Sequence, residues 1–179
     1  MTKLSLPKSS ALADLTDTQF RKFSIEVKQH TGVNMELHKK NLLSNRLKRR
    51  IKALNLTDYE EYYSLITGPQ SKKELPFFID EVTTHETYFY RGDKSWKYYT
   101  EQFLPKWKEA QGSTPLKIWC AVASTGEEPY TIAILSEEYK VKNKEFSYQI
   151  VASDISGAVI KNAKKHTIQD AVLKRCLSH

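Results

Sequence analysis

The sequence has few of the features that would tie the protein to a membrane, a metal or an oxidising compartment. It contains only two cysteines, Cys120 and Cys176, which make no disulfide framework and have no metal-ligand spacing. No apolar run approaches the roughly 18 residues that a membrane span needs, and the N-terminus lacks the apolar core of a secretory signal. We therefore expect a cytoplasmic protein without membrane insertion and without a metal site.

Composition and charge are those of an ordinary globular protein. Of the 179 residues, 40% are hydrophobic and 27% are charged, which is typical of folded soluble domains. The formal net charge of +7 favours acidic partners, but charge alone does not choose among them.

Helical patterns fill the chain up to about residue 110. Residues 1–15 show no periodicity and are expected to be a flexible lead-in. Capping patterns and apolar stripes then predict a series of helices that cover 16–31, 36–54, 57–67, 73–82 and 95–108. The stretch 111–115 contains Gly112 and Pro115 and gives the best linker signal. We therefore expect a helical domain over 16–110 and an α/β domain over 116–179.

The most informative stretch covers residues 118–130 and is typical of a strand, a tight loop and a helix start. An apolar run ends in small residues and Gly126, which let a ligand approach the backbone closely. Glu127 and Glu128 follow where a helix N-terminus favours negative charge, and Pro129 suits the first turn. Stabilisation of the helix dipole is the simpler explanation of these acids. A phosphate site would normally leave the helix start free of carboxylates, so the loop suits a ligand with hydroxyls and positive charge.

A second strand is expected over 148–153, and Asp154 stands at its end. An acid at the carboxyl end of the second strand of an open α/β sheet can accept hydrogen bonds from ribose hydroxyls. Asp154 or Ser156 would serve equally well as the N-cap of a following helix that carries Val159. The spacing leaves both interpretations open.

Cationic residues crowd the helix expected over 36–54. They are Lys39, Lys40, Arg46, Lys48, Arg49, Arg50 and Lys52. No acid is interspersed among them, so the usual i,i+4 ion pairs are lacking. A solvated helix face is the simpler interpretation, and docking on an acidic partner is the alternative. Nucleic acid is disfavoured as the partner because no stacking platform or base-reading motif accompanies the run.

Four segments together resemble a known family. They are IWCAVASTGEEPYTIAI at 118–134, VTTHETYFYR at 82–91, VASDIS at 151–156 and RLKRRIKALNL at 46–56. In this order and spacing they are similar to the signatures of the CheR-type chemotaxis-receptor glutamate methyltransferases, in which the first segment is the S-adenosylmethionine loop. The resemblance covers roughly residues 20–165 of the chain.

The resemblance implies a small N-terminal helical bundle followed by the start of a Rossmann-like class I methyltransferase α/β domain. The implied reaction is methyl transfer from S-adenosylmethionine to glutamate side chains of chemotaxis receptors, with S-adenosylhomocysteine as product. Arg91, in a bridging segment at 83–91, is the expected catalytic residue. The cofactor-binding residues that the resemblance implies are Thr84, Thr87, Arg91, Ala121, Gly126, Glu127, Glu128 and Asp154. Those implied to bind acidic receptor helices are Arg46, Lys48, Arg49, Arg50 and Lys52.

Two departures from the family pattern bear on activity. Val122 replaces the family's first loop glycine, and a β-branched residue is unfavourable if that turn needs a positive φ. Its methyl groups would also intrude on the cofactor. Only two strands are expected over 116–179, too few to form a doubly wound sheet covered on both faces. The remaining alternatives are a fragment of a longer protein, a partner chain that completes the sheet, and a truncated, degenerate relative that binds receptor helices without methylating them.

Overall fold

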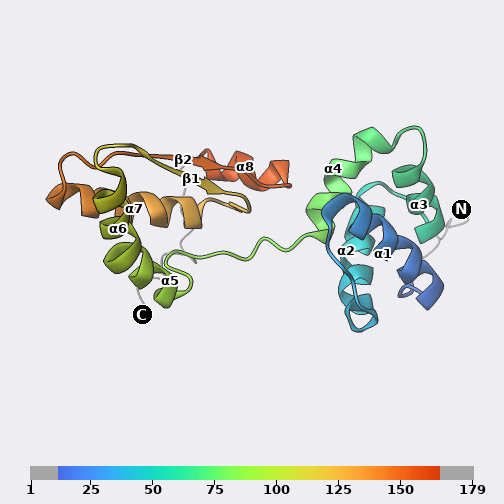
Figure 1. The fold of residues 1–179 in the computed structure, drawn as a ribbon. Coiled ribbons are helices and arrows are strands. Elements are labelled where there is room, and N and C mark those ends of the chain that lie inside the picture. The colour runs from blue at the N-terminus through green and yellow to red at the C-terminus, as the bar shows by residue number, and fades with distance from the viewer. Residues whose placement is uncertain (1–11, 166–179) are drawn as a thin grey trace, which may run out of the picture. The chain divides into compact units, whose positions relative to one another are not determined.

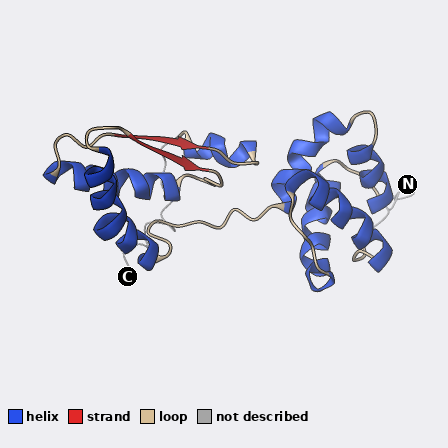
Figure 2. Cartoon of the chain, viewed as in Figure 1, coloured by secondary structure: helices blue, strands red, loops and turns tan. Residues whose placement is uncertain are grey.

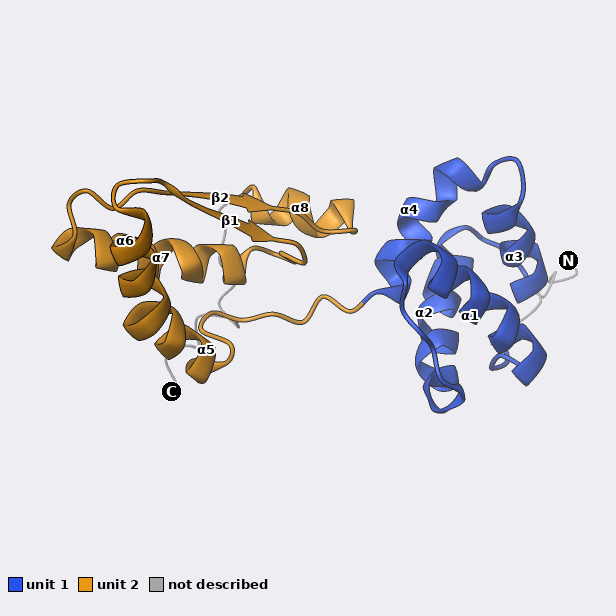
Figure 3. Cartoon of the chain, in the orientation of Figure 1, with its two compact units in different colours: residues 1–83 blue, residues 84–179 orange. Residues whose placement is uncertain are grey.

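The computed structural model describes residues 12–165, which form two compact units (Figure 1, Figure 3). The first unit ends at Thr83 and the second begins at Thr84. The division therefore falls in the expected bridging segment and not at 111–115, where the sequence has its linker signal. Residues 1–11 and 166–179 lie outside the described residues, and with them part of the expected lead-in and the last part of the expected α/β domain.

Helices alone build the described part of the first unit (Figure 2). They are α1 (Asp17–Thr31), the short 3₁₀ helix η1 (Leu37–Lys39), α2 (Lys40–Ala53), α3 (Tyr59–Thr67) and α4 (Ser71–Val82). Their ends follow local chemistry. Thr16 and Gln19 form a reciprocal capping box at the start of α1, and Gly32 ends that helix with a φ of 74°. The Asp58 side chain accepts the Glu61 N–H at the start of α3.

The core of the first unit lies where these four α-helices meet. Phe23 of α1, Tyr62 of α3 and Phe78 of α4 are fully buried and their rings pack together, and Leu43 and Leu47 of α2 complete the core. This packing explains the apolar stripes of the sequence, because each helix turns one stripe inward.

The end of the expected lead-in also belongs to this core. Leu15 is buried, and its N–H donates to the Ser44 hydroxyl at 3.2 Å. The Tyr59 hydroxyl donates to the Ala13 carbonyl at 2.9 Å. For residues 12–15 the expectation of a flexible lead-in is therefore wrong, because hydrogen bonds to α2 and α3, rather than any periodicity, hold this stretch.

A buried ion pair joins α2 to α4. The Arg50 guanidinium donates to both carboxylate oxygens of Glu74, at 2.5 and 2.8 Å, and the Tyr62 hydroxyl donates to the same carboxylate at 3.0 Å. Glu74 is only 5% exposed. Burial and the neighbouring carboxylate raise the pKa of Tyr62, so its hydroxyl stays protonated and remains a donor.

The second unit combines helices with a two-stranded sheet (Figure 2). Its elements are α5 (Asp93–Tyr98), the π-helical turn η2 (Tyr99–Phe103), α6 (Leu104–Gln111), β1 (Leu116–Cys120), α7 (Glu127–Lys142), β2 (Tyr148–Ala152) and α8 (Gly157–Ala163). The strands are parallel, with Leu116 paired to Tyr148 and Cys120 to Ala152. The expected fold class, a helical bundle followed by an incomplete α/β domain, is confirmed. None of the described helices is long and apolar enough to cross a membrane.

One face of the sheet is packed and the other is open. Leu116 and Ile118 pack with Leu104 of α6 and with Phe146 in a small apolar core. This packing places α5 to α6 in the second unit, which is why the division differs from the expected one. Trp119 and Val151, which pair on the opposite face, are 71% and 55% exposed. Parallel sheets are normally covered on both faces.

We predict that Glu74→Gln lowers the free energy of unfolding of the first unit by about 3 to 5 kcal/mol, because it leaves the Arg50 charge without its buried partner. The matched control is Glu60→Gln, which breaks the exposed Lys22–Glu60 pair of the same unit (2.9 Å) and should change stability by less than about 1 kcal/mol. All three tryptophans lie in the second unit, so urea unfolding followed by circular dichroism beside tryptophan fluorescence assigns the change to the first unit. Equal effects of the two variants would contradict the prediction.

Candidate cofactor site

The loop after β1 is fastened to the end of β2 by backbone hydrogen bonds beyond the strands. The Ser153 N–H donates to the Cys120 carbonyl and the Ala123 N–H donates to the Ser153 carbonyl, both at 2.9 Å. The Ser153 hydroxyl also donates to the carbonyl of Ala121, an exposed residue, at 3.4 Å. These bonds place Asp154 beside the loop, as expected where the carboxyl ends of parallel strands meet.

Asp154 holds the loop instead of capping the next helix. Its Oδ2 accepts the Ser124 N–H at 2.8 Å, and its Oδ1 accepts the Ser156 N–H at 2.9 Å. Ser156 is the N-cap of α8, because its hydroxyl accepts the Val159 N–H at 3.3 Å. Of the two interpretations left open by the sequence, the capping role therefore falls to Ser156. Each carboxylate oxygen of Asp154 retains a further lone pair for a ligand.

The two acids at the start of α7 differ in their surroundings. Glu127 is 7% exposed, and one of its carboxylate oxygens accepts the Thr125 hydroxyl at 2.6 Å. Glu128 is exposed. No side chain caps the helix at Gly126. Both acids lie in the first turn of α7, where the helix dipole stabilises negative charge. Glu127 is thus fixed by the loop while Glu128 faces solvent.

Positive backbone φ angles occur in the loop at Ser124 (49°) and Gly126 (107°) but not at Val122. The turn therefore does not require a glycine at position 122, and the expected backbone conflict there is wrong. The Val122 side chain is 77% exposed. Glycine is needed instead at position 126, where an added Cβ would lie 2.8 Å from the Tyr130 ring.

The segment 84–91 lies against this loop and α7. The Ser124 hydroxyl donates to the His85 carbonyl at 2.8 Å, and the Tyr90 N–H donates to the Thr131 hydroxyl at 3.2 Å. Arg91 is exposed, and its guanidinium donates to the Glu86 carbonyl at 3.0 Å. The structure thus brings the segment that carries Arg91 to the same loop as Asp154.

The two threonines of this segment differ in exposure. Thr84 is exposed and Thr87 is partly buried. Their contribution to a cofactor site remains a prediction.

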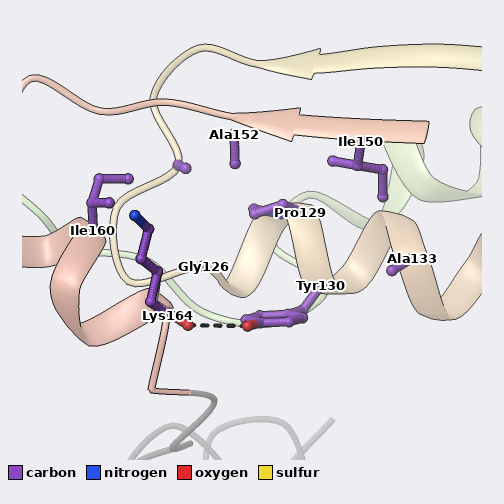
Figure 4. A pocket seen from close by; sticks show the side chains of 10 residues that line it. Gly126, Pro129, Tyr130, Ala133, Ile150, Ala152, Ile160 and Lys164 are labelled. Atoms are coloured by element: carbon purple, nitrogen blue, oxygen red, sulfur yellow. Dashed lines mark hydrogen bonds between the residues drawn. The ribbon is translucent and has the colours of Figure 1, made fainter.

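A cavity of about 360 Å³ lies beside the loop, between β2, α7 and α8 (Figure 4). Its lining is mostly apolar and consists of Ala123, Gly126, Pro129, Tyr130, Ala133, Ile150, Ala152, Ile160, Ala163 and Lys164. The Tyr130 hydroxyl donates to the Ala163 carbonyl at 3.0 Å and closes one side. Among the residues predicted to bind a cofactor, only Gly126 lines this cavity. Sequence reasoning missed the others because strand and helix residues meet here only through tertiary packing.

The cationic residues of α2 are largely paired within the first unit. Lys48 contacts Asp14 at 2.6 Å and Arg49 contacts Glu81 at 2.9 Å. Their acidic partners come from other segments, so the absence of acids within the run did not leave it unpaired. Arg50 is largely buried against Glu74, and Arg46 donates to the Val82 carbonyl. Arg49 and Lys52 are exposed, Arg49 even while it is paired with Glu81.

Comparison with protein families assigns both units. The model of the CheR methyltransferase all-alpha domain matches residues 18–83, and that of the CheR methyltransferase SAM-binding domain matches residues 85–178. The chain belongs to the CheR methyltransferase family. The two matches meet where the structure divides, between Thr83 and Thr84.

Curated relatives within the CheR family support this assignment. A chemotaxis protein methyltransferase of Escherichia coli is 32% identical over 173 residues, which cover 97% of this chain and 58% of the relative. One from Borreliella burgdorferi is 33% identical over 138 residues, which cover 75% of this chain and 49% of the relative. The chain thus spans about half the length of the curated relatives it matches.

We predict that Gly126→Ala destabilises the second unit by at least about 2 kcal/mol, because alanine adds both a strained φ and a clash with Tyr130. The control Gly92→Ala also introduces alanine at a positive φ (87°) in the second unit, but the nearest atom to its Cβ would be the Ser95 Oγ at 3.8 Å, an ordinary contact. It should cost about 1 kcal/mol. Urea unfolding followed by tryptophan fluorescence measures both. If both variants lost the same free energy of unfolding, the clash with Tyr130 would be disproved.

Proposed function

We propose that the second unit binds S-adenosylmethionine at the loop 121–126, and that the protein transfers its methyl group to receptor glutamates. One observation carries the proposal. The loop, the end of β2 and the segment that carries Arg91 converge through the hydrogen bonds of Ser124 to Asp154 and to His85. These three segments are the ones that the family resemblance implies for the cofactor.

The polar groups at this site fit the ligand's chemistry. S-adenosylmethionine has a ribose diol, an amino group, a carboxylate and a sulfonium. Asp154 has lone pairs left for two hydroxyl donors, and Glu127 is fixed by one hydroxyl and has a second oxygen for an ammonium group. Arg91 is exposed and matches a carboxylate with its planar fork.

The proposed reaction asks little acid–base chemistry of the protein. The bound cofactor supplies an electrophilic methyl group on its sulfonium. A substrate glutamate is already ionised at neutral pH, since its reference pKa is about 4.3. The residues of this chain then act by holding both reactants in line, and such positioning can supply several kcal/mol. Arg91 would orient a carboxylate at the edge of the site.

The proposed receptor contact lies on α2 of the first unit. Arg49 and Lys52 are exposed there, whereas Arg50 is committed to Glu74. Exposed charges of one sign steer an acidic partner and make its association sensitive to salt. We therefore assign recognition of acidic receptor helices to Arg49 and Lys52, and a structural role to Arg50.

The cofactor proposal predicts that the chain binds S-adenosylhomocysteine with micromolar affinity in isothermal titration calorimetry. Glu127→Gln should weaken binding by about tenfold or more, because it removes the charge that faces the ligand's amino group. The adjacent Glu128→Gln is the matched control and should bind as the wild-type chain does. No heat from the wild-type chain would reject cofactor binding and favour a non-catalytic receptor-binding role. Equal losses from the two variants would reject the role of Glu127.

The receptor proposal predicts that an acidic coiled-coil peptide from a receptor binds the chain more weakly as salt rises. The double variant Arg49→Glu, Lys52→Glu should weaken binding several-fold through charge repulsion. Lys28→Glu, an exposed position on α1, is the control for charge reversal elsewhere. Fluorescence anisotropy with the peptide and with duplex DNA tests the assignment. Stronger binding of DNA than of the peptide would overturn it.

A further inference from the structure

Two buried hydroxyl groups of the α/β part of the chain form hydrogen bonds to the two ends of segment 84–91. We call this pair of hydrogen bonds the bracket. Ser124 lies in the loop and Thr131 lies on the first turns of α7. The Ser124 hydroxyl donates to the His85 carbonyl at 2.8 Å, and the Thr131 hydroxyl accepts the Tyr90 N–H at 3.2 Å. The two bonds therefore hold the segment at points five positions apart, on either side of Thr87.

Each hydroxyl is itself fixed in direction. Thr131 is fully buried and donates its own proton to the Glu127 carbonyl at 2.6 Å, which leaves its lone pairs for the Tyr90 N–H. The backbone N–H of Ser124 donates to Asp154 at 2.8 Å, so the residue cannot turn away from the loop. Both side chains thus couple the segment to groups of the candidate cofactor site.

The backbone at the two bonds is strained in the same way. Ser124 has a φ of 49° and Tyr90 a φ of 57°. Non-glycine residues adopt positive φ when the surrounding structure imposes it. The two hydrogen bonds therefore fix the backbone path of segment 84–91, even though Ser124 and Tyr90 adopt unfavourable φ angles. This backbone path determines where Thr87 and Arg91 lie.

We propose that Ser124 and Thr131 are positioning residues that hold segment 84–91 on the cofactor loop. The proposal rests on the proposed function, because it assigns the bracket to cofactor binding. Removal of either hydroxyl would remove one of the hydrogen bonds that hold the segment to the loop or to α7. The loss should then appear in the segment and in ligand affinity, beyond any general loss of stability.

Amide hydrogen exchange tests the bracket without any ligand. Ser124→Ala removes the bond to His85 but keeps the N–H that binds Asp154, and Thr131→Val removes the bond to Tyr90 at nearly constant volume. Exchange of peptides within 84–91 should rise about tenfold in each variant, as expected for the loss of one hydrogen bond. Thr131→Ser retains the hydroxyl and should exchange as the wild-type chain does.

Ser136→Ala is the matched control. Ser136 is also fully buried on α7, but its hydroxyl bonds to Tyr99, at 2.7 Å, and not to the segment. It should lower stability without changing exchange in 84–91. Unchanged exchange in Ser124→Ala and Thr131→Val, or an equal rise in Ser136→Ala, would overturn the bracket.

Calorimetry with S-adenosylhomocysteine tests the assignment to cofactor binding. Affinity should fall about tenfold in Ser124→Ala and Thr131→Val and stay at the wild-type value in Thr131→Ser and Ser136→Ala. Faster exchange with unchanged affinity would overturn the positioning role. A wild-type chain that binds no ligand would reject the proposed function, while the exchange experiment would still decide whether the bracket holds the segment.

Discussion

The hydrogen bond from the Ser124 amide to Asp154 is the constraint on which the candidate site depends. It ties the loop after β1 to the end of β2, across 30 positions of sequence. The same loop has positive φ at Ser124 and Gly126, and α7 begins at Glu127 directly after it. Glu127 is buried directly after this loop, and segment 84–91 is bonded to the loop through the Ser124 hydroxyl.

Local sequence chemistry predicted much of the fold, and it failed where long-range packing decides. The capping box at Thr16 and the glycine after β1 located helix ends because their partners are a few residues away. The linker signal at 111–115 was misleading, because Leu104 packs with Leu116 and Phe146 across it. No periodicity could show that Leu15 would be buried by α2.

The candidate site shows the same limit. The family resemblance pointed to Asp154 and Glu127, and the geometry brings both to the loop. Neither spacing nor motif indicated Thr131, because a threonine on a helix is a common residue whose partner, Tyr90, lies 41 positions away. The expected conflict at Val122 failed for a related reason: the positive φ angles fell on its neighbours, which a motif comparison cannot locate.

The buried carboxylate of Glu74 and the two carboxylates of the candidate site are held in different ways, and this difference bears on ligand chemistry. In the first unit, the buried carboxylate of Glu74 pairs with Arg50 of α2, so the charge of this carboxylate is largely cancelled. Among the described residues, Asp154 and Glu127 accept hydrogen bonds only from backbone N–H groups and a hydroxyl. These donors fix the carboxylates without cancelling their charge. A site so built attracts cations and suits a ligand that carries an ammonium and a sulfonium better than one that carries phosphates.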